Sequence, residues 1–94
     1  MSVLVKIPTQ LRSVTGGAAE VEVAASNVSE VIDALETAHP GVRERLLDAD
    51  GHLRRFVNIY VNDEDVRFLD GLGTGIGEGA KVAIIPAVAG GSSR

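Results

Sequence analysis

The most suggestive chemistry in this sequence lies in the main chain of its last residues. Residues 87–91 (Ala-Val-Ala-Gly-Gly) follow an apolar, strand-like run. Glycine has no Cβ, so Gly90 and Gly91 can thread a slot too narrow for other residues and adopt backbone angles that they avoid. We therefore predict that Gly91 presents a main-chain carboxylate inside another protein's active site, and that Val88, Ala89 and Gly90 thread the slot with it.

A simpler interpretation is that residues 90–94 are a frayed terminus or linker residues left by cloning. The preceding domain favours the functional interpretation, because an apolar strand and then a short spacer lead directly to the glycine pair. We expect one folded domain over residues 1–87 and a flexible tail over residues 88–94 that carries the two glycines.

Composition excludes several classes of site. The 94 residues make one domain, and the absence of cysteine excludes disulfides, thiolate zinc sites, iron–sulfur clusters and a cysteine nucleophile. A net charge of −4 argues against nucleic acid and favours a partner with a basic docking surface. No apolar run approaches the roughly 20 residues that span a bilayer, so we expect no membrane association and a cytoplasmic protein.

Hydrophobic periodicity predicts the elements that position the tail. Alternation predicts strands, and apolar residues at 28, 31, 32 and 35 predict a helix that begins after Asn27, with Glu30 at capping-box spacing, and ends at Pro40-Gly41. A short helical turn is expected near residues 42–47. The expected strands are Val3–Ile7, Val21–Val23, Phe56–Val61, a short return strand Val66–Phe68, and Lys81–Pro86.

This order predicts an α+β fold of the β-grasp, or ubiquitin-like, type: a mixed four- to five-stranded sheet with one main helix across one face. The first and last strands should pair in parallel at its centre, because the helix makes the required crossover. Aromatic residues are 3% of the chain, so we expect an aliphatic core built around Phe56, Tyr60 and Phe68, with Leu11, Leu72 and Ile76 as loop anchors.

Three further clusters favour structural roles. Asp48, Asp50 and His52 miss the spacing of a calcium loop, so no metal site is predicted. The glycine-rich segment 75–80 precedes a strand instead of opening a helix, which argues against dinucleotide binding. Residues 63–65 (Asp-Glu-Asp) form a solvated turn or a docking contact. No catalytic constellation is found, which indicates a carrier or binding module and not an enzyme.

The sheet face away from the helix is a candidate docking surface. Ile85 and Leu4 are expected there side by side on the central strands, with nothing left in the chain to cover them. Pro8 and Asp65 are further candidates for contact with a partner.

Two segments, Phe56–Arg67 and Ile84–Gly91, closely resemble the sulfur carriers of the MoaD/ThiS family, nearest to its CysO type. The resemblance implies that an E1-like enzyme uses ATP to adenylate the carboxylate of Gly91, and that sulfur then replaces AMP to leave a thiocarboxylate. It places Gly90 as the threading partner and Ile85 where the family keeps an apolar docking residue. It also implies that the carrier itself binds no cofactor.

The implied partners are the E1-like adenylating enzyme or sulfurtransferase, a sulfur-accepting synthase of the cysteine or thiosugar type, and a JAMM-type metalloprotease. One departure from the family pattern is Ser92-Ser93-Arg94, since active members end at the second glycine. The recipient metabolite and the origin of these three residues stay open. A ubiquitin-like modifier that forms isopeptide bonds and a plain β-grasp binding module are the alternatives.

Overall fold

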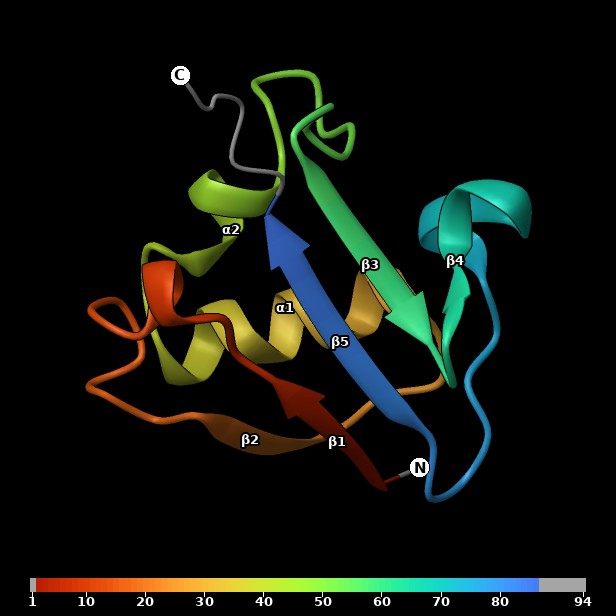
Figure 1. The fold of residues 1–94 in the computed structure, drawn as a ribbon, viewed down its shortest axis with the longest axis horizontal. Coiled ribbons are helices and arrows are strands. Elements are labelled where there is room, and N and C mark those ends of the chain that lie inside the picture. The colour runs from red at the N-terminus through yellow and green to blue at the C-terminus, as the bar shows by residue number, and fades with distance from the viewer. Residues whose placement is uncertain (1, 87–94) are drawn as a thin grey trace.

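The structure, a computed structural model, describes residues 2–86. It contains one five-stranded sheet in the order β2-β1-β5-β3-β4, in which only the central pair β1 and β5 runs parallel (Figure 1). The main helix, α1, packs across one face. This is the predicted β-grasp fold with the predicted central pair. The strands are β1 (Ser2–Lys6), β2 (Glu20–Ala24), β3 (Val57–Val61), β4 (Glu64–Asp65) and β5 (Lys81–Pro86).

The crossover helix α1 (Val28–Ala38) forms as its sequence predicts. The Asn27 side chain accepts a hydrogen bond from the Glu30 amide at 2.8 Å, and the Glu30 carboxylate accepts one from the Ser26 amide at 2.7 Å. These contacts satisfy amides that have no partner within the helix. Gly41 (φ 106°) then leads into the short helix α2 (Val42–Leu46). The apolar stripe of α1 is buried against the sheet: Val28, Val31, Ile32 and Leu35.

The core is aliphatic, and the expectation that it forms around aromatic residues is wrong. Phe56 is 53% exposed and Phe68 is 86% exposed, while Tyr60 is half-buried. On β3 the buried residues are Val57, Ile59 and Val61. Since side chains alternate across a strand, Tyr60 belongs to the opposite face, and Phe56 lies in the turn just before β3.

The predicted return strand is displaced toward the N-terminus. β4 comprises Glu64–Asp65, and Val66–Phe68 forms a 3₁₀ helix in its place. Positive φ angles at Asn62 (50°) and Asp63 (73°) make the tight hairpin that starts β4 early. The Asp65 carboxylate then accepts a 2.8 Å hydrogen bond from the Arg67 amide, which turns the chain into the 3₁₀ helix.

Loop residues complete the core. Leu11, in the 3₁₀ helix Thr9–Leu11, and Ile76 are buried, and Leu72 packs partly against the core, as predicted.

The helices within residues 2–86 include none with the length and hydrophobicity that a membrane span requires.

Candidate functional site

The predicted reactive tail begins where β5 ends. Gly91, Gly90, Ala89 and Val88 lie outside the described residues, as does the predicted domain boundary at residue 87. Pro86, the last described residue, pairs with Val57 of β3, and β1 flanks β5 on its other side. The chain therefore reaches the tail from the end of the central strand. The pairing with β1 stops at Ala83, so only β3 pairs with the last three residues of β5.

The face of the sheet away from α1, which we call the open face, contains the predicted docking residues of β5. Val82 and Ile84 are buried on the face that α1 covers, whereas Ala83 and Ile85 point to the open face, as the alternation predicts. Ile85 is 49% exposed. An isoleucine exposed so close to the start of the tail is available to contact a partner.

Leu4 and Ile85 are not side by side, contrary to the sequence-based expectation. The parallel register pairs Leu4 with Lys81, and Ile85 lies four residues further on, or roughly 13 Å at about 3.3 Å per residue. The error arose because the alternation of a strand identifies the face of a residue but not its position opposite the neighbouring strand.

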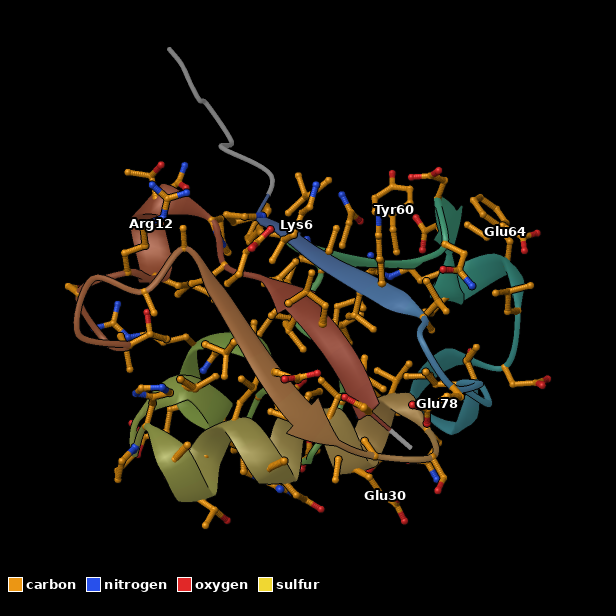
Figure 2. The ribbon with its side chains drawn as sticks, turned by 90° about the horizontal axis from the view of Figure 1, so that it is seen from below. Lys6, Arg12, Glu30, Tyr60, Glu64 and Glu78 are labelled. Atoms are coloured by element: carbon orange, nitrogen blue, oxygen red, sulfur yellow. The ribbon has the colours of Figure 1, made fainter. Side chains whose placement is uncertain are left out.

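Pro8 takes the place beside Ile85 that was assigned to Leu4. Both line a groove of about 510 Å³ between the end of β5 and the 3₁₀ helix that follows β1. Lys6 and Arg12 line the same groove, and Arg12 is fixed by a 3.2 Å hydrogen bond from its Nε to the carbonyl of Ile7. Figure 2 shows Arg12 and Lys6 along the same margin of the molecule. The groove thus combines an apolar floor with a basic rim.

Asp65 lies in β4, at the edge of the sheet opposite to β2, where it pairs with Tyr60 of β3. Its carboxylate holds the Arg67 amide, and the Arg67 guanidinium donates to the Asn58 side chain at 2.6 Å and to the Arg54 carbonyl at 2.8 Å. Asp65 therefore shapes this edge, and its contact with a partner stays a prediction.

Comparison with known proteins places this geometry in a family. The family model described as the ThiS family matches residues 5–91, from β1 through both glycines. The chain belongs to the ThiS family. The sulfur carrier protein CysO of Mycobacterium tuberculosis strain H37Rv is 54% identical over 93 residues, which cover 97% of this chain and 100% of that relative.

Solved structures agree with this ThiS-family assignment. A chain of the Amycolatopsis orientalis BexX/CysO complex superposes with a TM-score of 0.89 at 49% identity, covering 94% of this chain and 98% of that one. SAMP1 from Haloferax volcanii superposes with a TM-score of 0.82 at 30% identity, covering 96% and 99%. The predicted family, its CysO type and the β-grasp fold are confirmed. So is the prediction of a carrier in place of an enzyme, because the curated relatives that are 54% identical are sulfur carrier proteins.

The exposed cluster Asp48, Asp50 and His52 comes together in space, with its potential ligand atoms within 4.8 Å of one another. The Asp48 carboxylate accepts hydrogen bonds from the backbone amides of Asp50 (2.9 Å) and His52 (3.0 Å). The hydrogen bond from the His52 amide is the main cause that lowers the pKa of Asp48; desolvation opposes it, and the hydrogen bond from the Asp50 amide adds to the lowering. These contacts explain the cluster as a loop-shaping turn, and the absence of a metal site stays a prediction.

Sequence reasoning missed two basic residues of the open face, Lys6 and Lys81. Together with Tyr60 they surround a second hollow of about 310 Å³. Figure 2 shows Lys6 and Tyr60 pointing away from α1. Strand alternation already places Lys6 on the face of Leu4 and Lys81 on the face of Ile85, so the sequence could have identified both lysines. The prediction considered only the apolar residues of this face.

Proposed function

We propose that this sulfur carrier protein of the CysO type carries sulfur as a thiocarboxylate on Gly91. The observation that supports this most directly is the continuity of the chain: the central strand β5, with Ile85 exposed near its end, leads through a short spacer into Gly90-Gly91, and the ThiS-family match extends through both. A partner bound to the open face would therefore meet the start of the tail.

The chemistry requires no side chain of the carrier. A carboxylate is a poor electrophile, so an E1-like partner transfers AMP from ATP to the Gly91 carboxylate and releases pyrophosphate. Sulfide released by a donor then attacks the acyl carbon, AMP leaves with the electrons of the broken acyl–oxygen bond, and loss of the proton on sulfur gives a thiocarboxylate. The carrier contributes a narrow, unbranched backbone that reaches the partner's active site. ATP is bound by the partner and not by the carrier.

The reaction requires a free carboxylate at Gly91. While Ser92-Ser93-Arg94 is attached, the carbonyl of Gly91 belongs to an amide and cannot be adenylated. We therefore propose that a protease removes these three residues before activation. The alternative is that they are not native to the carrier.

Partner docking is proposed for the open face. Ile85 and Pro8 line one groove and are proposed as its centre, because a few side chains buried in a desolvated pocket supply most of the binding energy of an interface. Leu4, further along the same face, and Asp65, at its edge, belong to the periphery of this surface.

The sulfur acceptor is proposed to be a second partner enzyme. The Amycolatopsis orientalis relative was solved as a BexX/CysO complex, which supports direct binding between a carrier of this type and another protein. A synthase that makes cysteine or a thiosugar fits the chemistry of a thiocarboxylate nucleophile, and a JAMM-type metalloprotease would release a product that remains attached to the tail. We place these steps in the cytoplasm.

Mass spectrometry tests the proposal. The chain ending at Gly91 is incubated with ATP, an E1-like partner and a sulfur donor. We expect the mass increase of one oxygen-to-sulfur exchange. The same chain lacking Gly91 and the untrimmed chain are controls that should not change. No exchange with any of several cognate adenylating partners would exclude the function.

A protein-modifier function is the second candidate, because SAMP1 of Haloferax volcanii, a small archaeal modifier protein, shares this fold at 30% identity. It predicts higher-mass conjugates in cell lysates that disappear when Gly91 is deleted. If truncation after Ala89 changes neither conjugates, sulfur transfer nor partner binding, the chain is instead a plain β-grasp binding module.

A further inference from the structure

A hollow at the centre of the open face has no role in the function proposed above. Its floor is Ala83 of β5, and the strand register places Lys6 of β1 on one side of Ala83 and Tyr60 of β3 on the other. Lys81 lies on the same strand and the same face as Ala83. Since alanine carries only a methyl group, the three longer side chains rise around a depression of about 310 Å³.

The polar groups around this hollow are available to a ligand. Lys6 and Lys81 are exposed, and within residues 2–86 the ion pair between Arg43 and Asp33 is the only one, so neither lysine forms an ion pair there, although Glu20 lies opposite Lys6 on β2. Asp63 also lines the hollow, which leaves two positive charges against one negative. The Tyr60 hydroxyl makes no hydrogen bond to the described part of the chain. The hollow therefore offers two ammonium groups and a phenol as donors.

The charge of the open face changes sign across the sheet. Glu20 and Glu22 of β2 pair with Lys6 and Leu4, so both point to this face along one edge, and Asp65 lies at the opposite edge. The basic hollow lies between these acidic margins. A net charge of −4 for the whole chain therefore conceals a local positive centre. Such alternation favours one partner and one orientation of docking.

We propose that the hollow receives a carboxylate side chain from the surface of the adenylating partner, bound over Ala83 between Lys6 and Lys81 with the Tyr60 hydroxyl donating to it. A carboxylate has two oxygens that accept several hydrogen bonds, which matches these donors. The occupant is a protein surface because Lys6 and Ala83 also line the groove that contains Ile85. One docked surface thus covers both. This inference rests on the proposed function and adds the charge of the partner's docking surface.

Charge reversal tests the inference. Lys6→Glu and Lys81→Glu are compared with Arg45→Glu, which makes the same change of charge at an exposed position in α2. Ala83→Leu fills the hollow without changing charge. The assay measures pyrophosphate release from ATP by the adenylating partner with each carrier ending at Gly91, and thermal unfolding confirms that each variant folds.

For Lys6→Glu, Lys81→Glu and Ala83→Leu we expect kcat/KM for the carrier to fall by about tenfold, with kcat at saturating carrier unchanged. The deficit of the two lysine variants should shrink as salt is raised. Arg45→Glu should match the wild type, and a glutamate-to-lysine reversal on the partner should restore the Lys6→Glu carrier.

Two results would overturn the inference alone. The first is that the lysine variants behave like Arg45→Glu. The second is that NMR shifts show inorganic phosphate binding at Lys6 and Lys81 of the isolated carrier, while phosphate competes with the partner no better than salt does. A wild-type carrier that is not adenylated would overturn the proposed function, and the inference with it.

Discussion

The two faces of the sheet are built from alternate residues of the same strands, yet their properties are opposite. On β5, Val82 and Ile84 are buried on the face that α1 covers, while Ala83 and Ile85 face outward. Ala83 lines both hollows, and Ile85 lines the groove beside Pro8. The covered face stabilises the fold, whereas the outward side chains of the open face remain accessible to solvent. Because neighbouring residues divide these roles, single substitutions can separate stability from binding.

The largest difference is expected between Ile84→Ala and Ile85→Ala. Ile84 is 3% exposed, and its truncation should destabilise the fold by about 2–5 kcal/mol through lost burial and a cavity. Ile85 is 49% exposed, so Ile85→Ala should cost about 1 kcal/mol or less. Urea unfolding of both variants measures the difference. Equal losses would show that the open face is also part of the core.

The same Ile85→Ala variant should instead weaken partner binding. A central apolar anchor contributes about 2 kcal/mol, so the Kd for the adenylating partner should rise by roughly thirtyfold. Titration calorimetry with the chain ending at Gly91 measures it. Leu4→Ala is the control on the same face, and its effect should be smaller because Leu4 lies outside the groove; an equal effect would extend the docking centre along β1.

Phe68 extends the comparison between exposed and buried apolar residues, because an aromatic side chain normally belongs to a core. It is 86% exposed in the 3₁₀ helix after β4, so Phe68→Ala should change the free energy of unfolding by less than about 0.5 kcal/mol. Val66→Ala, in the same helix but fully buried, is the contrasting variant and should cost more. Thermal unfolding ranks the two, and a larger loss for Phe68 would return the aromatic residue to the core.

Substitution of Asp48 should have the smallest effect, visible only in how the free energy of unfolding depends on pH. Its folded-state pKa is lowered by the His52 amide, so its contribution to stability is present above the unfolded pKa of about 3.9 and is lost as pH falls through the folded value. Asp48→Asn should flatten this acid limb of the unfolding curve. Asp50→Asn is the neighbouring control. An unchanged acid limb in Asp48→Asn would show that its hydrogen bonds do not favour the ionised form.

Local patterns of the sequence predicted most of the fold. The apolar stripe from Val28 to Leu35, the Asn27 cap and the alternation of β1 and β5 each depend on residues within a few positions of one another, and all are confirmed. Alternation also implied that Phe56 faces outward, but hydrophobicity was given more weight and the core was wrongly centred on aromatic residues.

The sequence by itself determined which residues share a face and where the chain must turn, because these follow from backbone periods and local sterics. It also showed that Gly90 and Gly91 follow the last strand after a short spacer. Only the tertiary structure decided which residues meet across strands. It separated Leu4 from Ile85, brought Pro8 to the groove and placed Ala83 between Lys6 and Tyr60. Strand register depends on pairing between segments far apart in the chain, which no local pattern encodes.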